Sequence, residues 1–251
     1  MKAILTYHSL DTSGSVVSVH PDRFREHLDL LGRGDVPVLP LARLLDPDCD
    51  RGVALTFDDG FENFATVAWP LLRERGWPAT LYVATEWVGK QNAWDPTDDR
   101  IPRLPLLGWP ALRVLADEGL EIGSHSLTHP RLTALADGAL AEEVGRAREV
   151  ITGEIGRVPE SFAYPYGDYN ARVAEAAERT GYGSAVTTEL RPLTGRERSR
   201  FALPRLDAYY LAKPGVMERW GTPAFGRYVL FRSAARSMRR FLSRTTTPRG
   251  A

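Results

Sequence analysis

The chain has 251 residues with 32 Lys or Arg and 32 Asp or Glu, so its formal net charge is zero. Hydrophobic residues make up 43% and charged residues 25%, which excludes a disordered chain, because disorder requires low hydrophobicity and a high net charge. The 22 glycines follow no period, which excludes a collagen-like repeat, and the single cysteine excludes an intrachain disulfide and a Cys-rich zinc site.

Short β-type runs alternate with longer helical patterns through the first 208 residues. We expect strands at 3–8, 53–59, 79–85, 120–125, 161–166, 183–188 and 203–208, and helices near 21–32, 62–75, 109–118, 137–155 and 170–180. This alternation predicts parallel strands joined by crossover helices. Seven such units favour a closed or nearly closed barrel, with an open doubly wound sheet as the alternative. Residues 86–108 follow no period and predict a long loop over one barrel face.

Polar residues fall at the carboxyl ends of three expected strands. His8 ends the first, Asp58 and Asp59 end the second, and His125 ends the fourth, with His129 just beyond it. In parallel α/β barrels this end of the strands carries the active site. The i, i+4 spacing of His125 and His129 lets both imidazoles face one point, which suits a divalent metal.

The adjacent carboxylates of Asp58 and Asp59 predict two different roles. Neighbouring side chains of an extended strand point to opposite faces, so both carboxylates cannot point inward from such a strand. One would complete a His-His-carboxylate metal site, and the other would be free to act as a base. The alternative is that one of them caps the following helix, where acids are favoured.

Two sequence motifs together resemble a known family. The segments TFDDG at 56–60 and HSLTH at 125–129 look like the first two motifs of the polysaccharide deacetylase family (the NodB-homology domain, carbohydrate esterase family four). Residues 161–167 resemble its third motif and residues 203–206 its fourth region, so the resemblance runs from about residue 1 to 208. It implies a distorted (β/α)7 barrel and metal-dependent removal of acetyl groups from sugars.

The resemblance also implies roles for individual residues. Carried over by position, Asp59, His125 and His129 would be the ligands of a divalent metal, most often zinc in the family, and Asp58 would be the general base. The backbone N–H of Tyr166 would hold the oxyanion together with the metal.

The sequence departs from the family pattern in its third motif. Phe162 stands where the family usually has an Arg that orients the catalytic base. Arg205 is our candidate for the missing guanidinium beside Asp58. The alternative for Arg205 is a surface ion pair, for instance with Asp207.

A second departure concerns the general acid, which the family takes from a late histidine. No histidine follows His129 in this chain, and His8 is our candidate, because a barrel brings its first and last strands together. An early Tyr-His also resembles the permuted branch typified by poly-N-acetylglucosamine deacetylases. The alternative is that His8 is a core or loop histidine. We expect His20 and His27 to be solvated.

The long loop carries Trp87 and Trp94. Their flat apolar rings would either stack on sugar faces or anchor the loop itself. Trp109 is expected to begin a helix and to pack.

The end of the chain has a composition of its own. Residues 219–251 contain eight Arg and no acid, so the zero net charge is the sum of an acidic body and a basic tail. Within 224–244 apolar residues recur at steps of three and four among arginines, which predicts a basic amphipathic helix whose apolar positions are Tyr228, Phe231, Ala235, Met238 and Leu242. Such a helix docks on the acidic body, binds a partner or lies on an anionic membrane surface, and nucleic acid ranks last because no recognition motif is present. We expect residues 1–212 to form the barrel and residues 213–251 to form a basic extension.

The first residues, MKAILTYHSL, contain an apolar run too short for a signal peptide, and no apolar run approaches the roughly 18 residues of a membrane span. We therefore expect a cytoplasmic protein, with membrane-surface association through the tail as a further option.

Residues and resemblance together favour a metal-dependent N-deacetylase. Its substrate would be an N-acetylated sugar, as a polysaccharide, an oligosaccharide or a lipid- or nucleotide-linked precursor. The same site suits an O-acetyl esterase, because a hydroxyl leaving group demands less of a general acid. A catalytically weak carbohydrate-binding module is the alternative from another class, motivated by the two departures from the family pattern.

Overall fold

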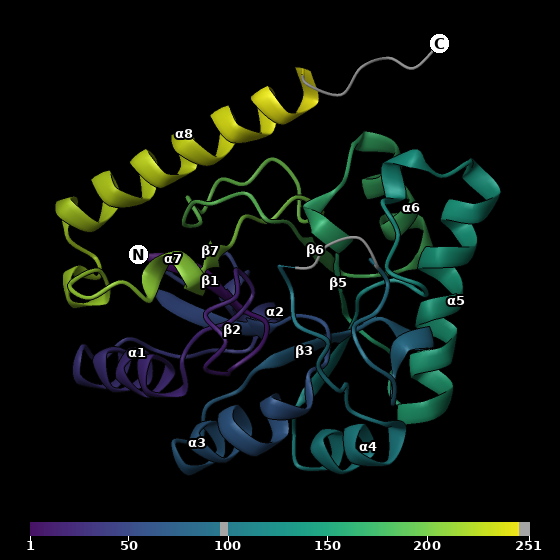
Figure 1. Cartoon of the computed structure of the whole chain (residues 1–251), viewed down its shortest axis with the longest axis horizontal. Helices are drawn as coiled ribbons and strands as arrows, with labels where there is room; N and C mark the ends of the chain where they lie inside the picture. The colour runs from purple at the N-terminus through teal and green to yellow at the C-terminus, as the bar shows by residue number, and fades with distance from the viewer. Residues whose placement is uncertain (96–99, 246–251) are drawn as a thin grey trace.

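Seven parallel strands form one curled sheet with the spatial order β6-β5-β4-β3-β2-β1-β7 (Figure 1). The computed structural model describes residues 1–95 and 100–245. The strands are β1 (Lys2–Tyr7), β2 (Gly52–Phe57), β3 (Thr80–Val83), β4 (Glu121–Ser124), β5 (Ser161–Ala163), β6 (Ser184–Val186) and β7 (Leu206–Asp207). Each overlaps the range expected from the sequence.

The segment that leads into β7 brings the two edges of the sheet together. Leu206 pairs with Leu5 of β1, whereas Leu203 forms a parallel bridge with Val186 of β6. The backbone N–H of Thr187 donates to the Leu203 carbonyl at 2.8 Å. The fold is therefore the distorted (β/α)7 barrel that the sequence predicts, closed by a short and irregular last strand, and the open doubly wound alternative is wrong.

Helices cover the outer face of this sheet (Figure 1). The helices of the chain are α1 (Pro21–Arg33), α2 (Leu41–Leu44), α3 (Trp69–Glu74), α4 (Trp109–Asp117), α5 (Asp137–Ile155), α6 (Ala171–Thr180), α7 (Ala208–Leu211) and α8 (Pro223–Thr245), with a π-helical turn (Phe64–Ala68) before α3. The short α2 is the exception to the outer layer, because Leu41 and Leu44 pack in the inner cluster with Ile4. Local sequence sets their ends, and α6 is an example. The Asn170 side chain accepts the Val173 N–H at 3.0 Å, and Gly181 ends the helix with a left-handed φ of 94°.

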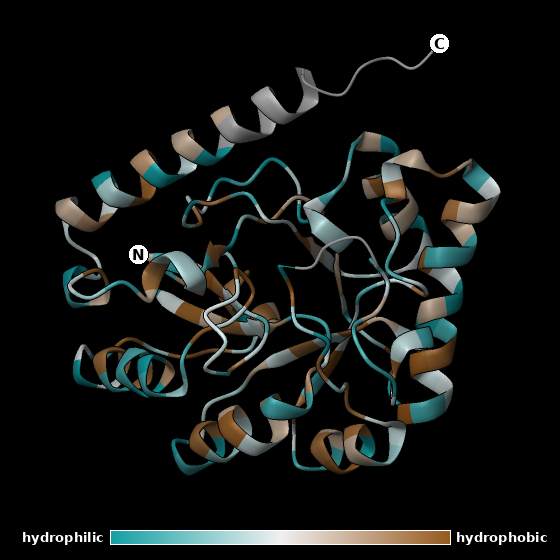
Figure 2. Cartoon of the chain, viewed as in Figure 1, coloured by the Kyte–Doolittle hydropathy of each residue, from teal (hydrophilic) through white to brown (hydrophobic). Residues whose placement is uncertain are grey.

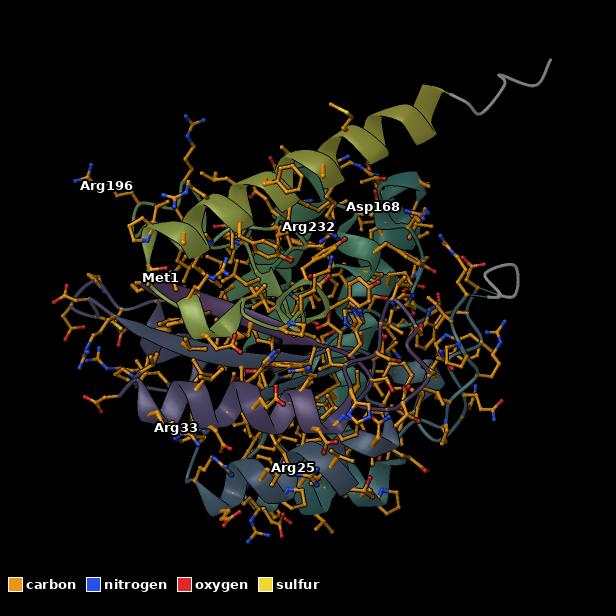
Figure 3. All side chains as sticks on the ribbon, turned by 60° about the vertical axis from the view of Figure 1, so that its left-hand side comes forward. Met1, Arg25, Arg33, Asp168, Arg196 and Arg232 are labelled. Carbon is orange, nitrogen blue, oxygen red and sulfur yellow. The ribbon has the colours of Figure 1, made fainter. Side chains whose placement is uncertain are left out.

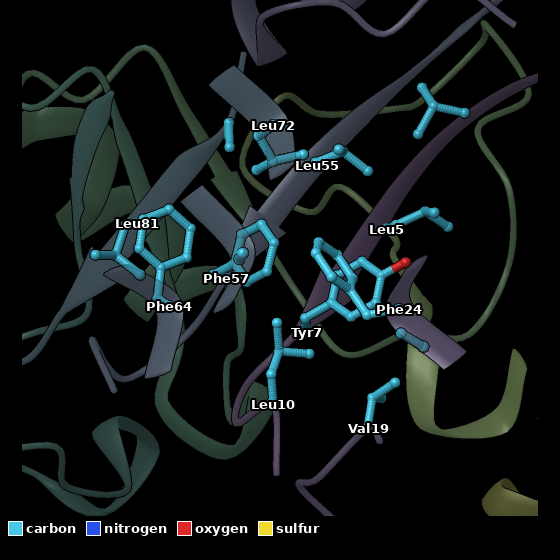
Figure 4. Packing of buried hydrophobic residues seen from close by; sticks show 14 of the residues in the cluster. Leu5, Tyr7, Leu10, Val19, Phe24, Leu55, Phe57, Phe64, Leu72 and Leu81 are labelled. Carbon is cyan, nitrogen blue, oxygen red and sulfur yellow. The ribbon is translucent and has the colours of Figure 1, made fainter. Parts of the chain in front are cut away.

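Strand side chains alternate between two apolar layers. In β1, Leu5 and Tyr7 pack outward toward the helices, whereas Ile4 points into the barrel. The outer layer is the larger core cluster and includes the stacked rings of Tyr7 and Phe57, whose centroids are 5.2 Å apart (Figure 4). Because both faces are buried, the strands are mostly apolar throughout, as their colour in Figure 2 shows.

The barrel interior below the polar strand ends is filled by the ring of Tyr82. Gly123 of β4 makes room for it, because a Cβ at this position would lie 2.5 Å from two ring carbons. The Tyr82 hydroxyl donates to Ser161 Oγ at 3.0 Å. The site therefore has a packed floor rather than an open channel.

The predicted C-terminal helix is present as α8, but only part of the predicted stripe packs on the body. Tyr228 packs against the main core cluster, whereas the side chain of Leu242 lies outside the described residues. Phe225 and Val229 are buried in the main core cluster, whereas Phe231 and Met238 are 69% and 67% exposed. Residues 225, 229, 232 and 236 lie on one helix face, and this row meets the body. Figure 3, where Arg232 is labelled, shows α8 lying across the body of the protein. In the described parts of the chain, no helix combines the length and apolarity needed to cross a bilayer.

One histidine that we expected in solvent is buried. His27 on α1 is 2% exposed, and its Nδ1 shares a hydrogen bond of 3.0 Å with the Tyr7 hydroxyl. The prediction was wrong because position 27 lies beside Phe24 and Leu28 on the buried face of α1. His20 is half exposed, as expected, and its side chain accepts the N–H of Asp22 at the start of α1.

Candidate active site

Three polar side chains occupy the first position after their strands and continue the inward-facing register. In β1, Ile4 faces the barrel interior, so His8 falls on the same face after the strand ends at Tyr7. Asp58 and His125 hold the equivalent positions directly after β2 and β4. All three line one cavity of about 280 Å³ at the carboxyl ends of the strands.

Asp59 reaches the same cavity because the chain does not stay extended after β2. Its φ is 75°, which turns its carboxylate toward His125. Ser126, His129 and Tyr166 also have positive φ, at 70°, 65° and 59°. Such backbone angles are costly for residues other than glycine and concentrate at functional sites. Both carboxylates therefore face the cavity, because the chain leaves the extended conformation at Asp59.

Asp59, His125 and His129 form a buried cluster of metal-ligand atoms. Asp59 Oδ1 lies 3.5 Å from His125 Nε2 and 3.6 Å from His129 Nε2, and one ligand atom from each residue lies within 4.8 Å of the others. His125 Nδ1 donates to the carbonyl of Ala163 at 2.7 Å, which leaves the Nε2 lone pair toward the cluster.

Two atoms of this cluster lack a partner. Asp59 Oδ1 and His129 Nδ1 are buried without a hydrogen-bond partner in the part of the chain that the structure describes. A buried carboxylate oxygen without a partner is costly, and two imidazoles with one carboxylate are a common zinc donor set. The residues therefore fit a divalent cation.

Burial sets the protonation states of the cluster. It raises the pKa of the Asp59 carboxyl, and it lowers the pKa of the His129 imidazole well below its usual value. His129 is thus neutral at pH 7, which is the form that binds metals. A cation would offset the cost of the buried Asp59 carboxylate.

Glu143 of α5 holds the loop that carries both histidines, and the sequence did not single it out. Its Oε2 accepts the backbone N–H groups of Leu127 and Thr128 at 3.0 and 2.9 Å. Ser126 Oγ accepts the N–H of His129 at 3.0 Å. Because Glu143 is buried, these hydrogen bonds are shielded from water and hold the loop in one conformation. The sequence offered one signal for this role: Glu143 is the only acid on the apolar face of the helix expected at 137–155.

Arg205 and Asp58 form a buried ion pair with two parallel hydrogen bonds. Nη1 and Nη2 of Arg205 donate to Oδ1 and Oδ2 of Asp58, each at 2.7 Å, and Nε donates to the Thr187 carbonyl at 2.9 Å. Burial alone would raise the pKa of Asp58, but the Arg205 guanidinium outweighs burial and holds this pKa well below its usual range. Arg205 is 1% exposed, so the alternative of a surface pair with Asp207 is wrong.

Phe162, at the family's Arg position, is buried in the outer core. Its ring lies 5.4 Å from that of Tyr164, centroid to centroid. The guanidinium beside the base comes instead from the segment before β7.

His8 lies at the cavity wall beside the ion pair. Its Nε2 is 3.7 Å from Asp58 Oδ2, and its side chain is 22% exposed. His8, Asp58 and Arg205 thus share one cavity, although they come from three separate segments.

Aromatic rings line the other side of the cavity. The Trp94 ring lies 4.3 Å from the His129 ring and the Tyr166 ring lies 4.7 Å from it, centroid to centroid. Trp87 sits behind Trp94, and its Nε1 donates to the Thr128 carbonyl at 3.0 Å. Trp94 therefore forms a wall of the cavity, whereas Trp87 anchors the loop. Trp109 begins α4, as expected.

Further lining residues were not foreseen, and they come mostly from loops and from α8: Val16, Val17, Asn92, Ile101, Arg103, Thr188, Tyr210 and Arg236.

Comparisons with known proteins agree with this architecture. The family model for polysaccharide deacetylase matches residues 46–185. YxkH of Bacillus subtilis (strain 168), whose name assigns it to the polysaccharide deacetylases, is 27% identical over 232 residues, covering 90% of this chain and 75% of YxkH. The poly-beta-1,6-N-acetyl-D-glucosamine N-deacetylase of Escherichia coli (strain K12) is 25% identical over 226 residues, covering 74% of this chain but only 33% of that protein.

Solved structures share the fold. The Streptococcus pyogenes deacetylase PplD in complex with acetate matches with a TM-score of 0.72 and 20% identity, over 92% of this chain and 97% of PplD. IcaB from Ammonifex degensii matches with a TM-score of 0.72 and 21% identity, over 90% and 96% of the two chains. The resemblance seen in the motifs is thus confirmed, and the chain belongs to the polysaccharide deacetylase family.

Proposed function

We propose that this protein is a metal-dependent hydrolase that removes N-acetyl groups from a carbohydrate. The observation that carries the proposal is the buried cluster of Asp59, His125 and His129 beside Asp58 in one cavity. Family membership supports an acetylated sugar as substrate, as do relatives named for the deacetylation of poly-N-acetylglucosamine and of chitin.

The cation would be held by Asp59 Oδ1 and by the Nε2 atoms of His125 and His129, and zinc suits this donor set. When bound, such a cation lowers the pKa of water and polarises an acyl oxygen.

Asp58 acts as the general base. It accepts a proton from water while the water oxygen attacks the acetyl carbonyl. The two hydrogen bonds from Arg205 fix the plane of the carboxylate and keep it ionised at neutral pH, so it is ready to take the proton.

Tyr166 and His8 act after the attack. The backbone N–H of Tyr166 donates a hydrogen bond to the oxyanion that develops on the acetyl oxygen. His8 gives a proton to the leaving nitrogen as the C–N bond breaks, so that acetate and a free amine result. The distance of 3.7 Å between His8 Nε2 and Asp58 Oδ2 supports this pairing of acid and base on one substrate.

Acetate release from a panel of matched N- and O-acetylated sugars tests the proposal. We expect acetate and free amine in equal amounts from N-acetylated sugars, and Asp58→Asn should lower the rate by about 10²–10⁴-fold. Faster release from the esters than from the amides, with His8→Ala unaffected on the esters, would identify an O-acetyl esterase instead. Sugar binding without any acetate release would identify a carbohydrate-binding module.

We also propose that residues 1–212 are the catalytic barrel and that the extension 213–251 contacts a cytoplasmic, anionic membrane surface. The exposed Leu230, Phe231 and Met238 beside exposed Arg227 on α8 support this contact. Cosedimentation with anionic and neutral vesicles measures it, and binding that Phe231→Glu leaves intact would contradict it.

A further inference from the structure

Arg236 of α8 reaches the cavity that holds the candidate catalytic residues. It lines the cavity wall with Asp207 and Tyr210, which belong to β7 and α7. Arg236 and Thr188 also line an adjoining cavity, whose wall includes Ser233 one turn earlier on α8. The C-terminal helix, which lies outside the barrel in Figure 1, thus places a positive charge between the two cavities.

The guanidinium of Arg236 has a donor that no described residue satisfies. Nη1 is buried and has no hydrogen-bond partner within residues 1–95 and 100–245. Its distance to Asp207 Oδ2 is 3.7 Å, too long for a hydrogen bond, and Asp207 Oδ1 accepts the N–H of Tyr209 at 3.0 Å. An arginine remains charged at every physiological pH, and a buried donor without an acceptor is costly.

The other arginines of this cavity already have acceptors. Arg205 binds Asp58, and Arg103 donates to the carbonyls of Asn92 and Asp95 at 2.7 and 3.0 Å. An acceptor brought by the substrate would therefore go to Arg236 rather than to these two.

The adjoining cavity is lined by side chains that carry hydroxyl groups and by one carboxylate, that of Glu189. Tyr169, Thr188 and Ser233 line the adjoining cavity together with Arg236. A guanidinium among hydroxyls is a common setting for phosphate oxygens, since both kinds of group donate hydrogen bonds to an anion.

We propose that Arg236 binds a phosphate group carried by the substrate, so that the enzyme acts on a phosphorylated N-acetylated sugar. This inference rests on the proposed function, because it names the substrate class of the same cavity. The phosphate is either that of a free sugar phosphate or the phosphodiester of a lipid-linked sugar.

Paired probes test the proposal. N-acetylglucosamine 1-phosphate is compared with the neutral methyl glycoside of N-acetylglucosamine, by kcat/KM for acetate release and by calorimetric Kd in the Asp58→Asn background, where turnover is suppressed. We expect the phosphate to be preferred about tenfold or more, and Arg236→Gln to bring the ratio close to one through a much larger loss on the phosphate than on the methyl glycoside. Arg236→Lys should keep part of the preference. Arg227→Gln, on the exposed face of the same helix, should keep all of it.

Several results would overturn the phosphate site. They are a ratio near one in the wild type, an equal loss on both probes in Arg236→Gln, binding of neither probe, or a preference for the carboxylate of N-acetylmuramic acid over the phosphate. A decyl phosphodiester of N-acetylglucosamine separates the two sources, since a preference for it supports a lipid-linked substrate and equal rates support a free sugar phosphate. If Kd depends on Arg236 but no probe releases acetate, the proposed function fails and the phosphate site stands. If acetate is released from both probes at a kcat/KM ratio near one, the proposed function stands and the phosphate site fails.

Discussion

The buried pair of Arg205 and Asp58 makes a quantitative prediction about stability. Arg205→Met leaves the Asp58 carboxylate at 2% exposure without its counterion, and the Thr187 carbonyl loses a donor at 2.9 Å. Two charge-assisted bonds of 2.7 Å disappear as well. Hydrogen bonds to charged groups contribute about 1.5–3 kcal/mol each, and breaking a buried pair costs about 3–5 kcal/mol. We expect the free energy of unfolding to fall by about 3–5 kcal/mol at pH 7.5.

Urea unfolding of the wild type and four variants at one fixed zinc concentration measures the coupling between Arg205 and Asp58. Arg205→Met and Asp58→Leu should each be strongly destabilised, whereas the double variant replaces both charges with apolar groups and should lose about 2–3 kcal/mol less than the sum of the single losses. Arg196→Met removes an exposed arginine (Figure 3) and should change stability by no more than about 0.5 kcal/mol. Additive losses, or a loss below about 1 kcal/mol in Arg205→Met, would refute the reasoning.

Three further predictions concern other parts of the molecule. Burial lowers the pKa of His27 from 6.5 to about 4, so the unfolded chain takes up the proton first and stability falls by up to about 3 kcal/mol as the pH drops from 7 to 4. Urea unfolding at pH 7 and pH 4 measures this loss, and His27→Gln should lose less stability over the interval than the wild type. An equal loss in the two proteins would show that His27 is not the cause. Gly167→Ala pushes a Cβ into the Thr188 side chain at a φ of 65° and should lower the melting temperature, whereas Gly153→Ala on α5, with nothing within 4 Å, should raise it slightly. If both glycine variants shifted the melting temperature in the same direction, the prediction would be contradicted. His8→Gln should lower kcat on N-acetyl sugars by about 10²-fold and on O-acetyl sugars far less, and equal losses would exclude His8 as the acid.

The strands and helices of the barrel were predictable because local sequence patterns specify each of them. Strands that are buried on both faces are read from apolar β-branched runs, and their crossover helices from turn and cap residues. The closing of the barrel was not readable in the same way, because β7 pairs through only Leu206 and Asp207. The packing face of α8 was predicted only in part, at Tyr228, since the apolar row at 225 and 229 competes with the stripe through 231 and 238, and only tertiary contact decides between them.

The site was predictable as far as short motifs extend. Asp58, Asp59, His125 and His129 lie in two such motifs, and the fold brings these segments together at the ends of β2 and β4. Glu143 was not predictable, because it acts through contacts with residues far away along the sequence. The place of Arg236 at the cavity wall was not predictable either, because the packing of α8 on the body decides it. An acid or a cation on a helix looks the same in sequence whether it faces solvent or a site.

Zinc content and acetate release, measured on the same samples, test whether Asp58 acts as the base and Asp59 as a metal ligand. The wild-type protein is predicted to bind one zinc ion per chain and to release acetate from an N-acetylated sugar. Asp58→Asn should keep its zinc and lose acetate release by about 10²-fold or more, whereas Asp59→Asn should lose both. Full acetate release by zinc-free Asp59→Asn protein would contradict the account.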